Sequence, residues 1–351
     1  PLRDALTREA TKRALAITAL GNAYTPVGRM IDERSVVNGL VGLHATGGST
    51  NHTIHLIAIA AAAGLSVTWQ DMSDLSDAVP LLARVYPNGV ADVNHFHAAG
   101  GMGFLIRELL ESGHLHEDVK TVWGGGLSGY TVEARLLEEK LSFEPVAKES
   151  GNNKILTSVK DAFSTSGGLK LLKGNLGKSV IKVSAVKPEH RLIEAPARVF
   201  HSQQGLQAAF KAGELNHDMI AVVRFAGPRA VGMPELHNLT PALSVLQGRG
   251  FKVALVTDGR MSGASGKVPA AIHMTPEAVD GGPISKLRDG DMLRLDADAG
   301  TLTFLGDERE LLSRTPATED LRHEHSGMGR ELFAGFRAMV GTADRGASVF
   351  G

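Results

Sequence analysis

The sequence predicts an α/β region followed by a β-rich, barrel-like domain with peripheral helices. The spacing of apolar residues differs between the two parts of the chain and predicts this order of domains. In the first part of the chain apolar residues recur at helical spacing, whereas beyond residue 165 short runs of β-branched and apolar residues dominate. A polar, serine- and glycine-rich stretch at 152–168 separates the two patterns. Because 351 residues exceed the roughly 100–200 of an ordinary domain, we expect two domains, at 1–155 and 165–351.

The elements of the first region follow from periodicity and capping residues. Ser49 or Thr50 is placed to cap an alanine-rich helix that runs to residue 63. The short apolar run at 67–69 is typical of a strand. The other helices are expected at 2–20, 74–85, 103–112 and 133–141.

The second region carries strand patterns separated by turns. Residues 219–225 and 251–257 are nearly continuous apolar runs, which are typical of buried strands. A turn at 298–300 joins two alternating segments and indicates a hairpin. The expected strands are 179–186, 197–201, 219–225, 251–257, 291–295 and 301–305, and the expected helices are 205–212, 241–246 and 330–340.

Composition excludes several classes of protein. Lys and Arg number 37 against 38 Asp and Glu, so the chain lacks the basic excess of a nucleic-acid-binding protein. The longest apolar stretch, 54–65, is shorter than the ~20 residues that span a bilayer. We recognise no secretory leader and expect a cytoplasmic protein. With no cysteine, this chain offers no disulfide, thiol nucleophile or iron–sulfur ligand.

The segment 253–267 is the most informative one chemically. A buried strand ends at Asp258 and enters a glycine-rich loop that contains two cations and two hydroxyls. Backbone N–H groups, cations and hydroxyls all stabilise negative charge, so this loop suits an anionic ligand. The same composition is also found in ordinary surface loops. Its candidate residues are Arg260, Ser262, Ser265 and Lys267.

A second loop, 227–236, contains Glu235 directly after a proline. A carboxylate at the start of a helical segment is favoured by the helix dipole. Alternatively, this carboxylate is a hard oxygen ligand of the kind that Mg²⁺ prefers.

A third loop, 43–52, places two glycines and three polar residues before an apolar helix. Helix N-termini bind anions through their free N–H groups, and they also carry plain capping turns. The candidate substrate-binding residues here are Ser49, Thr50 and Asn51.

Taken together, four motifs resemble one family. The segments 39–52 (GLVGLHATGGSTNH), 86–95 (YPNGVADVNH), 232–236 (GMPEL) and 257–263 (TDGRMSG) are similar to the dihydroxy-acid/6-phosphogluconate dehydratase family. The segments NHTIH, NHF, SGASGK and VPAAIH resemble its 6-phosphogluconate branch most. The resemblance extends over nearly the whole chain.

The resemblance implies an activity and its cofactors. Such enzymes remove water from a 2,3-dihydroxy acid, here 6-phospho-D-gluconate, to give 2-dehydro-3-deoxy-6-phospho-D-gluconate in the Entner–Doudoroff pathway. It implies a 4Fe-4S cluster and Mg²⁺ or a similar divalent cation. Because family members are longer and carry the cluster cysteines upstream, we expect a partial chain: the remnant of an N-terminal α/β domain and a swivelling barrel domain. A homodimer is also expected.

By motif, Ser262 matches the serine that removes the C2 proton in this family, and Glu235 matches a Mg²⁺ ligand. Our own hypothesis adds Ser265, Lys267 and Arg260 as groups that hold the substrate carboxylate or phosphate. Two alternatives stay open. One is a dehydratase for dihydroxy acids or another sugar acid, and the other is a non-catalytic binding or assembly fragment that lacks the cluster.

Overall fold

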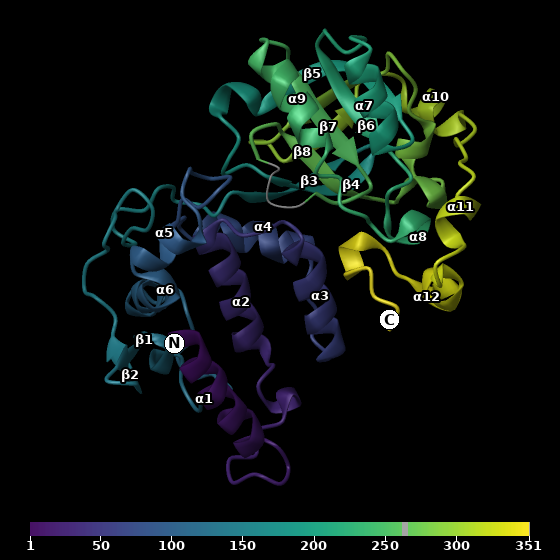
Figure 1. Ribbon diagram of the computed structural model, residues 1–351. Coiled ribbons are helices and arrows are strands. Elements are labelled where there is room, and N and C mark those ends of the chain that lie inside the picture. The colour runs from purple at the N-terminus through teal and green to yellow at the C-terminus, as the bar shows by residue number, and fades with distance from the viewer. Residues whose placement is uncertain (262–265, 351) are drawn as a thin grey trace. The chain divides into compact units, whose positions relative to one another are not determined.

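The computed structural model describes residues 1–261 and 266–350 (Figure 1). The chain forms two compact units that are interleaved in sequence. Unit 1 comprises Pro1–Gly47, Ala63–Leu65 and Asp77–Gly167, and unit 2 comprises Gly48–Ala62, Ser66–Ser76 and Gly168–Gly351. The segment that contains Ser49, Thr50 and Asn51 therefore belongs to the same unit as the second half of the chain.

Unit 1 is mainly helical. Helix α2 begins with a capping box, in which Asp32 accepts from Ser35 N–H and the Ser35 hydroxyl side chain accepts from Asp32 N–H, and it ends at Gly47 with φ +56°. Buried Leu82 donates its N–H to Ala45 O at 2.8 Å. The helices are α1 (Leu2–Ala16), α2 (Glu33–Thr46), α5 (Val93–Ala98) and α6 (Gly101–Glu111), with 3₁₀ turns η1 (Val27–Arg29) and η2 (Ser128–Tyr130).

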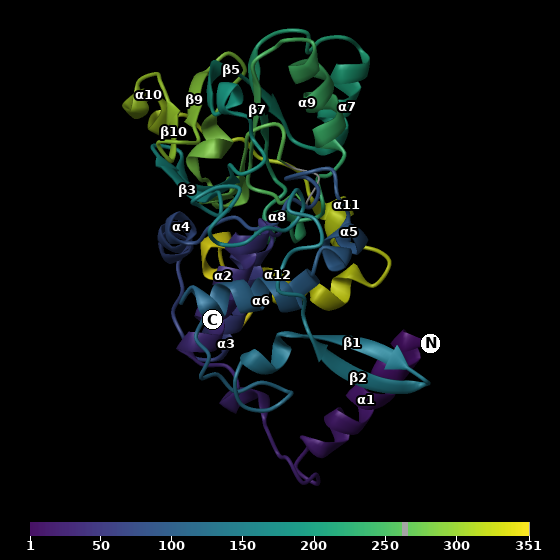
Figure 2. The same cartoon turned by 90° about the vertical axis from the view of Figure 1, so that its left-hand side faces the viewer.

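The helix expected at 133–141 is wrong. This segment forms an antiparallel hairpin of β1 (Val132–Leu137) and β2 (Lys140–Pro145), shown beside α1 in Figure 2. Glu138 and Glu139 make the two-residue turn with φ of 47° and 64°, both in the left-handed region that such turns require. Contacts of the hairpin with α1 and α6 outweigh the local helix propensity of its Leu, Glu and Lys residues.

The strand expected at 67–69 is also wrong. Thr68 N–H and its hydroxyl both donate to the Asp71 carboxylate, at 2.8 and 2.7 Å, and so begin helix α4 (Trp69–Ala78). The helix ends before Pro80 rather than at residue 85, because the residue preceding a proline disfavours helical geometry.

Unit 2 contains a closed, mixed barrel of eight strands, which confirms the expected β-rich, barrel-like architecture. The strand order is β10-β3-β4-β8-β7-β6-β5-β9, and the pairs from β5 to β8 through β6 and β7 are parallel. The strands are β3 (Leu169–Gly174), β4 (Gly177–Lys182), β5 (Leu192–Phe200), β6 (Met219–Val223), β7 (Val253–Thr257), β8 (Ala270–Thr275), β9 (Met292–Asp296) and β10 (Thr301–Phe304).

Strands β6 and β7 are buried along their whole length, which explains their continuous apolar sequences. One face fills the barrel core with Ile220, Val222, Ala254 and Val256. Helices α7 (Gln203–Lys211) and α9 (Leu239–Gly248) lie over strands β5 and β7 (Figure 1).

The remaining helical elements of unit 2 lie before, between and after the barrel strands in sequence. They are α3 (His52–Ala62), α8 (Pro228–Val231), α10 (Glu308–Ser313), α11 (Arg322–His325) and α12 (Ala334–Met339), with 3₁₀ turns η3 (Pro188–His190), η4 (Ala278–Asp280), η5 (Pro283–Lys286), η6 (Arg330–Phe333) and η7 (Ala343–Arg345). In the described part of the chain, every helix is too short or too polar to cross a membrane.

Candidate functional site

A buried carboxylate fixes the loops that leave β6 and β7. Asp258 directly follows β7 and is fully buried. It accepts backbone N–H bonds from Phe225 at 3.1 Å, Ala226 at 2.9 Å and Ala278 at 3.0 Å. Burial raises the pKa of Asp258, while these three N–H donors oppose the shift. Asp258 thus acts as a structural anchor for three chain segments.

Glu277 is a structural anchor for the loop 227–236. Its buried carboxylate accepts from Arg229 N–H at 2.9 Å and Ala230 N–H at 3.1 Å, in helix α8. Burial raises the pKa of Glu277 to about 7, and the nearby Asp258 charge adds to the shift. Gly227 leaves room for this carboxylate, since a Cβ there would lie 2.2 Å from Glu277 Oε2.

The two anchored loops bring Glu235 and Arg260 together. The segments pair through an isolated parallel bridge, and Leu236 N–H donates to Arg260 O at 3.2 Å. The Arg260 guanidinium donates to Met233 O at 2.6 Å and lies 3.5 Å from Glu235 Oε1.

Asn51 joins this pair from the turn before α3. Its Nδ2 donates to Glu235 Oε1 at 3.2 Å, across 184 positions of sequence. Glu235 Oε2 and Asn51 Oδ1 are buried and have no hydrogen-bond partner among the described residues. We call Asn51, Glu235 and Arg260 the carboxylate cluster.

A fully buried histidine lies close to the carboxylate cluster. The Thr53 hydroxyl donates to Thr50 O at 2.8 Å and lies 3.1 Å from His273 Nδ1. Because that hydroxyl proton is already used, His273 Nδ1 carries the proton and donates to Thr53. Burial, with the charges of Arg260 and His55, lowers the pKa of His273 to about 3, so the ring is neutral.

His273 also has a strained backbone, with φ +61° within β8. Its N–H donates to Gly259 O at 3.0 Å, which ties the strand to the loop that follows β7. Such conformations are uncommon for non-glycine residues and cluster at functional sites.

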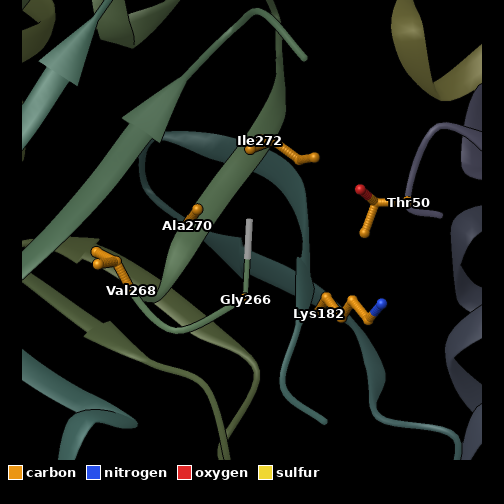
Figure 3. A pocket seen from close by; sticks show the side chains of 6 residues that line it. All are labelled: Thr50, Lys182, Gly266, Val268, Ala270 and Ile272. Carbon is orange, nitrogen blue, oxygen red and sulfur yellow. The ribbon is translucent and has the colours of Figure 1, made fainter. Parts of the chain in front are cut away.

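A pocket on β4 and β8 contains a buried lysine (Figure 3). It is a small, partly open pocket lined by Thr50, Lys182, Gly266, Val268, Ala270 and Ile272. Lys182 is 9% exposed and donates from Nζ to Gly48 O at 3.2 Å. Burial lowers its pKa to about 8. In Figure 3 the Lys182 amine and the Thr50 side chain lie on the same side of the pocket.

The structure thus brings together only some of the residues predicted from sequence. Glu235, Arg260 and Asn51 form one cluster, Thr50 lines the lysine pocket, and the Ser49 hydroxyl accepts from Asn51 N–H at 3.3 Å. Lys267 is exposed and does not line that pocket. Ser262 and Ser265 lie outside the described residues.

Sequence reasoning missed Lys182 and His273. For His273 the available signal was a histidine within a largely apolar strand, whereas Lys182 ends an alternating strand and carries no such signal. Within residues 1–261 and 266–350, no group of three His, Asp or Glu side chains is arranged to hold a metal ion.

Two family models match the chain. A family model described as the C-terminal domain of dihydroxy-acid/6-phosphogluconate dehydratase matches residues 154–347, and its N-terminal counterpart matches residues 1–130. The chain belongs to the dihydroxy-acid/6-phosphogluconate dehydratase family.

Curated dehydratases resemble the chain along its whole length. It is 64% identical to the phosphogluconate dehydratase of Rhizobium meliloti (strain 1021), over 99% of this chain and 58% of that protein. Identity to the Pseudomonas aeruginosa phosphogluconate dehydratase is 58%, over 100% of this chain and 57% of that protein. Identity to the Thermus thermophilus dihydroxy-acid dehydratase is 34%, over 99% of this chain and 59% of that protein. The chain therefore spans less than two thirds of the length of these dehydratases.

Proposed function

We propose that this chain forms part of a phosphogluconate dehydratase that converts 6-phospho-D-gluconate into 2-dehydro-3-deoxy-6-phospho-D-gluconate and water. The identity of 64% to a phosphogluconate dehydratase, against 34% to a dihydroxy-acid dehydratase, supports this branch of the family. The structural observation that carries the proposal is the buried Oε2 of Glu235 in the carboxylate cluster, which has no hydrogen-bond partner among the described residues.

Glu235 fits the role of a ligand to a divalent cation. Arg260 and Asn51 both approach Oε1, which leaves Oε2 without a donor among the described residues. A buried acceptor without a donor is costly, and a hard cation satisfies it. A Mg²⁺ ion held there would stabilise the negative charge that develops on the substrate oxygens.

The residues of this chain do not fit an iron–sulfur cluster, because the sequence contains no cysteine. We propose that any cluster ligands belong to sequence outside these 351 residues, and we derive no step through the cluster.

The reaction needs a proton to leave C2 and a hydroxyl to leave C3 as water, after which the enol tautomerises to the 2-keto-3-deoxy acid. We propose that the Ser262 alkoxide takes the C2 proton, as its motif in the family suggests. A serine hydroxyl is a weak acid, so the surrounding site has to stabilise the alkoxide. Among the described residues, the Asp258 carboxylate already accepts three backbone N–H bonds, so we do not propose it as the base.

Lys182 is proposed to hold an anionic group of the substrate in its pocket, with Thr50 beside it. Because charge-assisted hydrogen bonds contribute about 1.5–3 kcal/mol, Lys182→Met is expected to raise KM for 6-phosphogluconate by about 10- to 100-fold. The pKa of about 8 means that the ammonium loses its charge as the pH rises through 8. The KM of the unchanged enzyme is therefore expected to rise above pH 8, whereas Lys182→Arg should give a flat profile up to pH 10.

Lys178→Met is the matched control, since Lys178 lies on the same strand with a 57% exposed side chain. Steady-state kinetics between pH 6 and 10 make the measurement. An unchanged KM in Lys182→Met would remove Lys182 from substrate binding.

The assay of keto-acid formation tests the proposed function. The encoded polypeptide that contains this chain, purified without oxygen, is expected to convert 6-phosphogluconate faster than gluconate or 2,3-dihydroxyisovalerate. Preference for the branched-chain acid would favour the dihydroxy-acid alternative. Absence of product, iron and sulfide would favour a non-catalytic assembly role. A cytoplasmic homodimer and a swivelling motion of the barrel unit remain parts of this proposal.

A further inference from the structure

The hydrogen bonds around Glu235 are distributed unevenly between its two carboxylate oxygens. Oε1 receives Asn51 Nδ2 at 3.2 Å and lies 3.5 Å from Arg260 Nη1. Oε2 is buried and receives no donor from the described residues. An ion pair alone does not require this asymmetry, because a guanidinium commonly engages both oxygens of a carboxylate.

The orientation of the Asn51 amide follows from its contact with Glu235. An amide N–H has to face the carboxylate, so Nδ2 points at Oε1 and Oδ1 is the free end. Asn51 Oδ1 is buried and also lacks a donor within the ranges that the structure describes. Two touching side chains therefore each present one buried oxygen acceptor without a partner.

Both side chains are held by fixed backbone. Asn51 O accepts from Ile54 N–H at 3.1 Å and from His55 N–H at 3.2 Å, which fixes its backbone directly before α3. Glu235 is fixed by the bridge to Arg260. Because the backbone is hydrogen-bonded in place at both residues, the two oxygen acceptors are positioned before any cation binds.

We propose that Asn51 supplies a second oxygen ligand, through Oδ1, to the divalent cation that Glu235 binds through Oε2. This inference rests on the metal role of Glu235 in the proposed function. An all-oxygen donor set of a carboxylate and an amide carbonyl suits Mg²⁺ or Mn²⁺ rather than a soft metal. Arg260 stays on Oε1 and balances the carboxylate charge.

The rival explanation is that Asn51 only orients Glu235 through its N–H. Two substitutions separate the explanations. Asn51→Leu removes both the N–H donor and the oxygen. Asn51→Asp removes the N–H donor but keeps oxygen ligands, and it places a second negative charge beside Glu235.

The test is Mn²⁺ affinity, measured by the loss of the free-Mn²⁺ electron paramagnetic resonance signal, in the encoded polypeptide that contains this chain. We expect Asn51→Leu to weaken Mn²⁺ binding at least tenfold and Asn51→Asp to bind within threefold of the unchanged protein or more tightly. Asn216→Leu, at an exposed asparagine, is the control and should bind as the unchanged protein does. The unfolding midpoint of each variant shows that it is folded.

Two results would overturn the inference: unchanged affinity in Asn51→Leu, or an equal loss in Asn51→Asp and Asn51→Leu. Glu235→Gln, measured in parallel, separates this failure from failure of the proposed function. If Glu235→Gln weakens Mn²⁺ binding and Asn51→Leu does not, only the role of Asn51 is lost. If neither substitution weakens it, the metal role of Glu235 is also wrong.

Discussion

Replacing Glu235 by glutamine is expected to lower kcat/KM for 6-phosphogluconate by about a thousandfold, with the protein still folded. The substitution keeps the shape of the side chain and its acceptor for Asn51, but it removes the charge that holds the cation. A metal ion contributes several kcal/mol of transition-state stabilisation, and each 1.4 kcal/mol is about tenfold in rate. Steady-state kinetics at increasing Mg²⁺ concentration make the measurement, and high Mg²⁺ should restore only part of the rate.

Glu194→Gln is the control for this experiment. Glu194 is exposed and also pairs with an arginine, Arg294, at 2.7 Å, so the control removes a carboxylate–arginine pair away from the carboxylate cluster. It should leave kcat/KM within twofold. A Glu235→Gln enzyme with the same rate and Mg²⁺ dependence as the unchanged enzyme would contradict the assignment.

Ser262→Ala is expected to lower kcat by at least about 10²–10⁴, which is the usual contribution of a general base. KM should change little, since the proton is removed only in the chemical step. Exchange of the C2 deuteron of labelled substrate with solvent should disappear together with turnover. The iron and sulfide content of the polypeptide should stay the same.

Ser313→Ala is the matched control, because Ser313 is an exposed serine at the end of α10. A Ser262→Ala enzyme that retains exchange at C2 would assign the proton transfer to another group. His273, whose unprotonated Nε2 has no partner among the residues that the structure describes, would then be the next residue to replace.

The barrel strands were predictable where the sequence of a single strand or turn is characteristic by itself. The apolar runs of β6 and β7 are buried on both faces, and the turn at 298–300 joins β9 to β10 as its sequence indicates. The hairpin of β1 and β2 was not predictable, because its Leu, Glu and Lys residues favour helix locally. Its contacts with α1 and α6 stabilise the hairpin, and α1 lies far away in sequence.

For the candidate site, too, the residue types could be read from the local sequence, but their arrangement in space could not. Glu235, Arg260 and Asn51 were each marked by the chemistry of their own loop. Their convergence depends on the parallel pairing of the barrel strands and on the packing of the α3 segment in unit 2, neither of which is local.

The burial of Lys182 could not be predicted from the sequence either. In sequence it is a polar residue at the end of an alternating strand, which is typical of a solvated position. In the structure Lys182 Nζ donates to Gly48 O, and Thr50 lines the same pocket, contacts that the sequence of the strand does not indicate.

We propose that Glu235 holds a divalent cation. Anomalous diffraction at the manganese absorption edge, from crystals of the encoded polypeptide grown with Mn²⁺, tests it most directly. We expect a peak within coordination distance of Glu235 Oε2, on the side of the carboxylate opposite Arg260. A fully occupied manganese peak elsewhere, with Glu235 still paired only to Arg260 and Asn51, would contradict it.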